Sequence, residues 1–440
     1  MRIPGVCLAA VVSLAWPSLA QASPDDLFGW GPRSPAMGGT GVASSSGADA
    51  TYTNPALLSR SHRNVLTLGF ASATFDLHAD GGQLPGRVSA IPAKGVVVGA
   101  EVPIPFGGIL KDRVAAGLAF YTPSDALVRG RILYPETPEF PLLPDRSQAL
   151  GTRIAVGADL GHGVRAGAGF AALAALVGTI AVVNTGGSVG SHVDDQLVAN
   201  YAPTFGLSWD LPWDRAADGS TRWRVGAVWR GSLEARFGVN VDASKLSSLA
   251  LPVFNIAGVA QYDPQEAAFE VAREGDGWVV AAGVTWKHWS AYPGVFEPTI
   301  LCPAGKDCAA LTPPAIAFSD TLVPRVGAEK TFALPRHTAV RARAGFFFEP
   351  SPVPSRLDPS QAYDQASQQN VDVPTRFFDA DRYVFSLGGG VDLGDYAPFT
   401  LDVYAQYHVL ASTTVTTEPA PPAKLSGQVL AWGLMLGVRF

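Results

Sequence analysis

The chain has 440 residues, of which 47% are apolar and 16% are charged, with 47 glycines, 35 prolines and a net charge of −6. The apolar fraction is too low for a bundle of membrane helices, and the negative charge argues against a nucleic-acid partner, which needs a basic surface. Few charges combined with many glycines and prolines are typical of short strands joined by turns, so we expect an all-β fold.

The first 22 residues have the pattern of a secretory signal peptide. Arg2 provides the positive start, an apolar run extends from Val6 to Trp16, and Ala20-Gln21-Ala22 is a small-x-small cleavage site. A membrane anchor is the alternative, but the run is shorter than the ~20 residues that a spanning helix needs. We therefore expect cleavage after Ala22. The exported chain would keep Cys302 and Cys308, and a close, even pair in an exported protein predicts a disulfide.

Residues 23–63 are rich in Gly, Ala, Ser and Pro and show little alternation. Small residues let backbone pack closely in a confined space, which favours a compact folded segment. A disordered linker is the alternative, although Met37 and Leu57 are apolar enough to be buried. Asn54-Pro55-Ala56 predicts a turn just before the first strand, because proline fixes φ and asparagine can bond the nearby backbone.

From residue 64 onward, apolar residues recur at every second position, which is the period of a strand with one apolar face. In a membrane barrel the apolar face contacts lipid and the other face lines the lumen. We assign fourteen such segments, an even number as single-chain bacterial barrels require. The predicted strands are residues 64–76, 95–104, 113–122, 148–160, 164–175, 200–210, 222–238, 253–262, 277–291, 321–332, 338–349, 381–393, 399–413 and 425–440.

The predicted connections alternate between long and short, as outer loops and periplasmic turns do in barrels. Residues 263–276 form a turn that is longer than this scheme prefers. Tyrosines and tryptophans near strand ends predict an aromatic girdle at the membrane interface. The long connections are 123–147, 176–199, 292–320 and 350–380, the short ones are 334–337 and 394–398, and the girdle residues are Trp209, Trp213, Trp286, Trp289 and Tyr292.

Two segments allow a different interpretation. Ala166 to Val183 is uncharged and could be a spanning helix, but one helix would not explain fourteen alternating segments, so a strand followed by a loop is favoured. Gly186-Gly-Ser-Val-Gly190 matches a nucleophile elbow, which needs a helix after the serine, and no helix is predicted there. The seven histidines show no metal-binding spacing. We therefore expect no catalytic residue, no metal and no cofactor.

The last segment predicts a strand whose apolar face continues to the end of the chain. Outer-membrane barrels commonly end in this way, because the last strand is read by the barrel assembly machinery and closes against the first strand. We therefore predict an assembly signal here, with the assembly machinery as a partner. Its residues are Trp432, Leu434, Leu436, Val438 and Phe440.

Four parts of the chain together resemble one family, the outer-membrane long-chain fatty acid and hydrocarbon transporters of the FadL/TodX type. The resemblance runs from about residue 30 to the end. The matching parts are Ala36-Met-Gly-Gly-Thr-Gly-Val-Ala43 followed by Thr53-Asn-Pro-Ala-Leu-Leu58; Leu251-Pro252 and Gly258-Val-Ala260 leading into Trp286-Lys-His-Trp-Ser-Ala-Tyr292; Arg343 to Pro354 with Asp379-Ala-Asp-Arg382; and the terminal strand.

The resemblance implies a fourteen-stranded antiparallel barrel (residues 64–440) whose lumen is plugged by an amino-terminal hatch (residues 23–63). It assigns the hatch motif to Met37, Gly38, Gly39, Gly41, Asn54, Pro55 and Ala56. Ligand-contacting residues are not carried over, because the family motifs do not include them.

For function, the resemblance implies passive uptake of fatty acids or hydrocarbons across the outer membrane of a Gram-negative bacterium. The expected partners are the hydrophobic small molecule, outer-membrane lipid and lipopolysaccharide, and the expected state is a monomer. A structural or adhesin-like plugged barrel is the alternative. A barrel enzyme acting on lipids is disfavoured, because no nucleophile with a neighbouring base is visible in the sequence.

Overall fold

The computed structural model describes residues 21–22, 25–81, 84, 86–124, 137–143, 150–185, 188–215, 221–242, 253–294, 296–301, 316–364 and 369–440. The predicted disulfide pair, Cys302 and Cys308, and most of the predicted signal peptide lie outside these residues, so both remain predictions. In the described part of the chain, every helix is too short or too polar to cross a bilayer.

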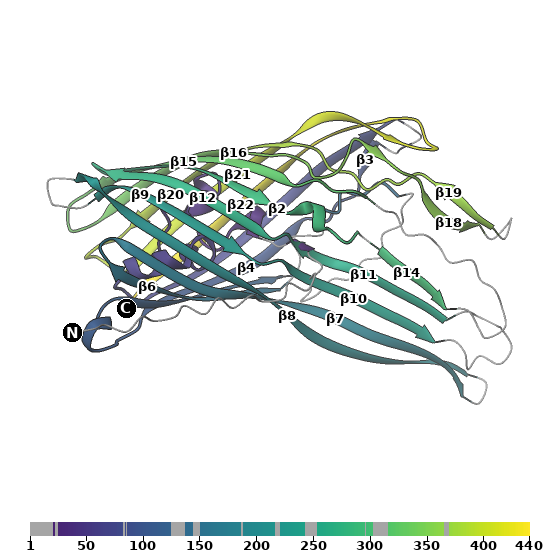
Figure 1. Cartoon of the computed structure of the whole chain (residues 1–440), viewed down its shortest axis with the longest axis horizontal. Coiled ribbons are helices and arrows are strands. Elements are labelled where there is room, and N and C mark those ends of the chain that lie inside the picture. Colours follow the sequence, from purple (N-terminus) through teal and green to yellow (C-terminus); the bar gives the residue numbers. More distant parts are fainter. Residues whose placement is uncertain are drawn as a thin grey trace, which may run out of the picture.

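Fourteen of the described strands form a closed antiparallel barrel, in which the last strand pairs with the first (Figure 1). The predicted fold class is therefore confirmed. In order around the barrel the strands are β2 (Val65–Asp80), β4 (Ala93–Pro103), β5 (Val114–Pro123), β6 (Gly151–Gly161), β7 (Val164–Thr185), β8 (Ser188–Arg215), β9 (Thr221–Arg230), β12 (Glu266–Gly275), β13 (Trp278–Lys287), β15 (Thr321–Ala333), β16 (Ala339–Glu349), β20 (Arg382–Asp392), β21 (Phe399–Thr417) and β22 (Ala423–Arg439).

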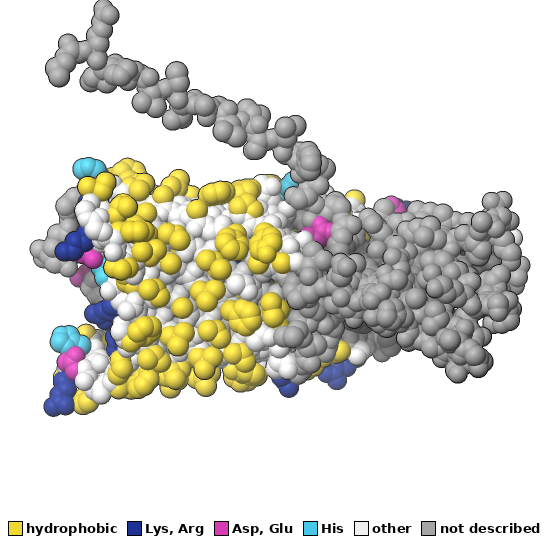
Figure 2. All heavy atoms as spheres, turned by 90° about the horizontal axis from the view of Figure 1, so that it is seen from below, with side chains coloured by type: hydrophobic (Ala, Val, Ile, Leu, Met, Phe, Trp, Pro, Cys, Tyr) yellow, Lys and Arg dark blue, Asp and Glu magenta, His cyan; other side chains and the backbone are white. Residues whose placement is uncertain are grey.

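The outer surface of the barrel carries an apolar belt, which Figure 2 shows as a band of hydrophobic side chains across the face in view. Strand β22 illustrates how alternation creates it. Trp432 and Leu434 are 42% and 44% exposed, whereas Met435 on the other face is 1% exposed. Backbone groups in such a closed sheet all pair with neighbouring strands, which is what the interior of a bilayer demands. The belt is therefore the lipid-facing surface of a membrane barrel.

The two ends of the barrel differ in their connections. At the end that carries Phe440, tight turns contain non-glycine residues with positive φ, such as His162 between β6 and β7 and Asp276 between β12 and β13. At the opposite end several connections are long, as between β13 and β15 and between β16 and β20 (Figure 1). By the usual pattern of bacterial barrels, the short turns mark the periplasmic end and the long connections the outer end.

The predicted number of barrel strands is right, but one predicted member is wrong. The expected turn at 263–276 is β12, which pairs with β9 and β13 inside the barrel. The expected barrel strand at 253–262 is β11 (Val253–Asp263), which pairs with β10 (Leu233–Asp242) and β14 (Phe296–Leu301) outside the ring. Charged residues hide the alternation of β12, because its glutamates face inward and bind the segment that fills the lumen.

The prediction of a long loop at residues 176–199 is also wrong, because these residues continue two strands, β7 (Val164–Thr185) and β8 (Ser188–Arg215). Strands β7 and β8 have 22 and 28 residues and are paired from Val164 opposite Trp209 to Thr185 opposite Ser188. Strand β10 joins the outer part of β7 in parallel, so β8, β7, β10, β11 and β14 form a sheet beyond the barrel. Ser188 opens a strand and not a helix, so the nucleophile-elbow geometry is not formed.

Shorter described strands lie in this outer region and at the edge of the barrel. They are β1 (Gln21–Ala22), which pairs with β10 and β11, β3 (Gly86–Val88), β17 (Arg356–Leu357), and the hairpin of β18 (Ser360–Asp364) and β19 (Gln369–Val373). The predicted girdle is only partly outward-facing. Trp213 is 70% exposed, but Trp289 is 1% exposed and packs in the outer loops.

Residues 27–60 lie inside the barrel, in the half nearer the short turns (Figure 1). Their short helices are α1 (Asp25–Phe28), α2 (Arg33–Ala36), α3 (Asp49–Thr53) and the 3-10 helix η1 (Pro55–Arg60); the 3-10 helices η2 (Gly108–Leu110) and η4 (Trp289–Ala291) belong to connections. Met37, Leu57 and Leu58 are each at most 1% exposed. We call residues 27–60 the plug, because they are packed against inward-facing residues of the barrel strands.

Candidate functional site

The plug is seated on glycines that face the lumen. At each of these positions an added Cβ would overlap a plug atom; at Gly388, for example, it would lie 2.5 Å from the Cβ of Ala36. Glycine is therefore required here by the close approach of plug backbone or small plug side chains to the wall, rather than by a turn. The seat is formed by Gly99, Gly117, Gly157, Gly167, Gly206, Gly226, Gly327, Gly345 and Gly388, on β4, β5, β6, β7, β8, β9, β15, β16 and β20 respectively.

The plug itself uses glycine where it touches the wall. Gly38 and Gly39 have φ of +66° and +70°, backbone angles that residues other than glycine rarely adopt. A Cβ on Gly38 would lie 2.6 Å from the backbone nitrogen of Phe346. The small-residue run of the sequence thus permits both the left-handed backbone and the contact with β16.

Glu270 on β12 binds the plug backbone directly. Its carboxylate accepts hydrogen bonds from the backbone N–H groups of Gly41 (2.7 Å), Val42 (3.0 Å) and Ala43 (3.0 Å), and from the Ser44 hydroxyl (2.8 Å). The side chain is 2% exposed. Successive N–H groups that converge in this way form an anion-binding concavity. The plug therefore carries an anion site, and the barrel wall provides the anion.

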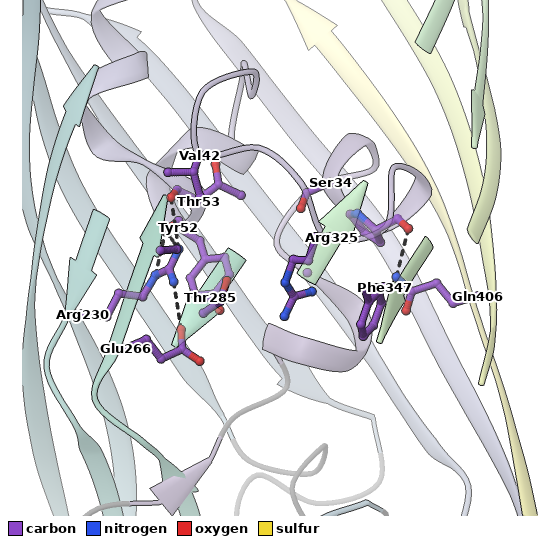
Figure 3. Close-up of a pocket in the computed structure, with 14 residues that line it drawn as sticks. Ser34, Val42, Tyr52, Thr53, Arg230, Glu266, Thr285, Arg325, Phe347 and Gln406 are labelled. Carbon is purple, nitrogen blue, oxygen red and sulfur yellow. Dashed lines mark hydrogen bonds and ion pairs between the residues drawn. The ribbon is translucent and has the colours of Figure 1, made fainter. Parts of the chain in front are cut away.

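The two other inward glutamates of β12 hold the plug through arginines. Glu266 accepts from Arg230 at 2.9 Å, and Arg230 also donates to the carbonyls of Tyr52 and Thr53 (Figure 3). Glu274 accepts from Arg60 of η1 at 3.0 Å. A strand whose carboxylates recur at every fourth residue thus contacts three separate parts of the plug.

A second set of ion pairs holds the start of the plug on the other side of the lumen. Arg33 donates to Glu329 on β15 at 3.2 Å, and Glu329 also accepts from Arg343 on β16 at 2.6 Å. Arg343 in turn bonds Asp402 on β21 at 2.6 Å. Removing one partner of such a buried network leaves an uncompensated charge, which destabilises the folded protein by about 3–5 kcal/mol.

Asn54 organises the turn before the first strand. Its Nδ2 donates to the carbonyls of Val42 (2.6 Å) and Leu207 (2.9 Å), and its Oδ1 accepts from the backbone N–H of Ala56 (3.1 Å). It precedes Pro55, which opens η1. One side chain thereby joins two parts of the plug to strand β8.

Asp49 is a buried carboxyl group at the centre of the plug. It accepts from the backbone N–H groups of Arg33 (2.9 Å) and Ser34 (3.1 Å). Burial, the largest influence on it, raises the pKa of this carboxyl from 3.8 to about 6, against the lowering effect of these bonds and of Arg33.

The raised pKa gives plug docking a pH dependence. The docked plug binds the Asp49 proton more tightly than the undocked plug, so the contribution of this one group to docking is fully present below about pH 4. It weakens as the pH rises towards about 6, by about 3 kcal/mol for such a shift. We expect hydrogen exchange of plug amides, corrected for intrinsic rates, to show this loss. Asp49→Asn should remove it, whereas Asp80→Asn at an exposed site should keep it; an unchanged profile in Asp49→Asn would contradict the assignment.

The lumen has one apolar side, formed by the inner faces of β22, β2, β4 and β5. Phe75 and Leu77 of β2 and Leu425 of β22 belong to a single buried cluster with Phe28 of the plug. The same cluster reaches Phe140 and Phe378 in the outer connections, where the N–H of Phe378 donates to the carbonyl of Glu139 at 2.8 Å. The apolar side is thus continuous from the outer end of the barrel to the plug.

Among the cavities lined by described residues, one lies beside the plug and another lies at the periplasmic end of the barrel. The inner one is small, about 40 Å³, and lies beside Arg230, Arg325 and Phe347 (Figure 3). The other is a wide vestibule of about 1180 Å³ at the periplasmic end. Among the residues that line it are Asn64, Pro103, Asp392, Arg439 and Phe440.

The structure brings the predicted hatch residues together on the barrel wall, but their anchors were not predicted. Glu270, Arg230 and Glu329 carry no motif, and the sequence signal available for them was weak. It was a run of carboxylates at every fourth position in an otherwise apolar segment of β12. The predicted terminal residues lie elsewhere, on the lipid-facing side of β22 and at the periplasmic rim.

Comparison with known proteins gives one curated relative and several structures. No protein-family model matches the chain. Alkane uptake protein A of Marinobacter nauticus is 23% identical over 351 residues, which cover 77% of this chain and 72% of that protein. A Pseudomonas aeruginosa FadL homologue superposes with a TM-score of 0.57 at 15% identity, covering 96% of this chain and 99% of that one.

Two toluene transporters have the same architecture. TodX of Pseudomonas putida gives a TM-score of 0.54 at 15% identity, and TbuX of Ralstonia pickettii gives 0.51 at 16% identity. Each comparison covers 94% of this chain and 99% of the other. At this level of identity the similarity establishes a common fold.

Proposed function

We propose that this FadL/TodX-like barrel is an outer-membrane channel for the passive uptake of hydrophobic molecules such as long-chain fatty acids, alkanes or aromatic hydrocarbons. The observation that carries the proposal is the apolar side of the lumen. A water-filled porin has a polar interior, whereas Leu77, Tyr121 and Leu425 form a buried apolar surface that reaches the outer connections. Such a surface offers a hydrophobic molecule a favourable environment that lipopolysaccharide and water do not.

Aromatic residues beyond the barrel form a buried group that would line the entry route. The rings of Tyr262 and Trp289 stack with centroids 5.1 Å apart, and those of Tyr292 and Phe318 stack at 4.4 Å. All four residues belong to the cluster that includes the apolar side or pack against it. Tyr262 and Trp289 are 2% and 1% exposed, so hydrophobic molecules would contact these rings inside the outer connections, on the way to the lumen.

The plug would act as the hatch of this channel, within the predicted segment 23–63. It occupies the lumen on close backbone contacts and buried ion pairs, so it would exclude polar solutes in its docked state. Transport would need no energy source, because burial of each CH₂ group in an apolar site is favourable by about 0.8 kcal/mol. The protein is expected to act as a monomer surrounded by lipid and lipopolysaccharide.

The proposal is tested by uptake in intact cells. A strain that lacks this protein should take up radiolabelled hexadecane or oleate more slowly than the same strain carrying the gene on a plasmid. Uptake of a small polar solute should be equal in the two strains. Equal uptake of every hydrophobic compound tried, with normal membrane levels of the barrel, would favour the alternative of a structural plugged barrel.

The terminal strand is proposed as the signal for the assembly machinery. We expect Phe440→Ala to lower the folded fraction in membranes, whereas the folded protein, once purified, keeps its heat resistance. Phe440 is 76% exposed at the rim, so its lipid contact is worth at most ~1.5–3 kcal/mol. Phe399→Ala is the matched control, because Phe399 faces outward on β21 opposite Val438. Equal membrane levels of both variants and the wild type would contradict a role in assembly.

A further inference from the structure

We infer that the turn between β4 and β5, residues 104–113, anchors the periplasmic rim of the barrel on the inner leaflet of the outer membrane, where it binds anionic phospholipid. Its apolar tip lies among the lipid headgroups and the first acyl carbons, and its two cations contact phosphate groups. This surface is outside the lumen, so it does not depend on the uptake that is proposed there.

The turn is apolar at an end of the barrel that faces water. Phe106, Ile109 and Leu110 are 45%, 87% and 44% exposed. Two other turns at this end are short and polar, namely Gly-His-Gly at residues 161–163 and Asp-Gly at residues 276–277. Several large apolar side chains exposed in one place mark a contact with protein or membrane. The turn between β4 and β5 therefore has a partner outside the chain.

The tip of this turn stands clear of the barrel. No atom of the described protein beyond the adjoining residues lies within 4 Å of a Cβ built on Gly107 or Gly108. Gly108 has φ of +64°, which lets the backbone bend into the short 3-10 helix η2. All three residues of η2, including Ile109 and Leu110, are exposed. The backbone of the turn thus displays these side chains to the surroundings.

The lipid-facing belt continues up to both sides of the turn. Val102 near the end of β4 is 43% exposed, and Leu160 at the end of β6 is 59% exposed. The N–H of Asp159 donates to the carbonyl of Arg113 at 2.8 Å, so the end of the turn is joined to β6 beside Leu160. Because lipid covers both flanking residues, the inner leaflet is the apolar phase nearest to the tip. Lipid is therefore favoured over a periplasmic protein as the partner.

The charges of the turn indicate which lipid it binds. Lys111 and Arg113 follow the apolar residues and are exposed, with Asp112 as the one acidic residue between them. Apolar side chains beside lysine and arginine are typical of segments that lie in a membrane interface and prefer anionic lipids. Elsewhere at this end the exposed His337 is already paired with Asp395 at 2.9 Å. The two cations of the turn thus match the phosphate groups of an anionic phospholipid.

Quenching of a fluorescent label in proteoliposomes tests the position of the tip. The mature barrel with Cys302→Ser and Cys308→Ser receives Ile109→Cys and an NBD label. The matched control is Asp276→Cys, in the exposed turn between β12 and β13. We expect a lipid with a nitroxide near its headgroup to quench the label at 109, and iodide on both sides of the membrane to leave it bright. The control should show the reverse.

Equal iodide quenching at the two positions overturns the inference, because the tip then lies in water, where only a protein could cover it. Misfolding does not obscure the result. The tip packs on no other part of the described protein, and migration of unboiled samples in gels reports whether each labelled barrel is folded.

The lipid headgroup is tested by moving the nitroxide from phosphatidylcholine to phosphatidylglycerol at the same lipid fraction. Quenching at 109 should increase, and Lys111→Gln with Arg113→Gln should remove the increase, at about fivefold in local lipid concentration for each cation. Lys330→Gln is the control, since Lys330 donates to the carbonyl of Asp276 in another turn. Equal quenching by the two lipids before substitution overturns the anionic preference. A preference that survives loss of both cations overturns their assigned role.

Discussion

Glu270→Ala is expected to detach the middle of the plug while the barrel remains folded. The change removes the acceptor of three backbone N–H groups and of the Ser44 hydroxyl, all of them buried. Each buried donor left without a partner costs about 1–3 kcal/mol, so docking should weaken by several kcal/mol. The measurement is trypsin cleavage after Arg33 and Arg60 in the folded barrel, which should accelerate strongly, together with leakage of a small polar solute.

Glu418→Ala is the control for this variant. Glu418 pairs with Arg356 at 2.9 Å, but both side chains are exposed, and such pairs contribute about 0–1 kcal/mol. Glu270→Gln should lie between wild type and alanine, because an amide keeps one acceptor oxygen. Full protection of both cleavage sites in Glu270→Ala would show that the bonds to Glu270 contribute little to docking.

Gly206→Val should have an effect of similar size through sterics alone. A Cβ at this position would occupy the place of the Asn54 side chain, and valine is well suited to the strand itself. We therefore expect a barrel that still assembles, migrates as the folded form in unboiled gels, and leaks small polar solutes because its plug is displaced. Gly345→Val should behave in the same way, since its Cβ would meet the backbone of Gly38.

Gly107→Val provides the comparison, because no atom lies within 4 Å of a Cβ at Gly107. It should leave the plug seated and the barrel closed to polar solutes. If Gly206→Val also keeps the lumen closed, the plug tolerates a shift at this point, and the glycine seat does not determine its position.

The strands could be predicted because a period of two is a local property. Each barrel strand must present apolar residues to lipid, and this requirement is visible within ten residues, as in the terminal strand up to Phe440. The failure at β12 has the same cause. The residues on its inward face are charged because they bind the plug. These partners are far away in the sequence, since Glu270 lies 229 residues from Gly41. A short window therefore contains the charges of β12 but not the groups that neutralise them.

The sequence by itself determined the membrane barrel, the number of its strands and its small-residue amino-terminal segment, because lipid, alternation and close packing act on neighbouring residues. Only the tertiary structure decided which residues hold that segment. The sequence alone does not distinguish a glycine that faces the lumen, such as Gly206, from a glycine in a turn, such as Gly394. Their difference arises when the closed sheet brings Gly206 to the level of Asn54, so that contact with the side chain of a residue distant in the sequence, and not the local chain, requires glycine there.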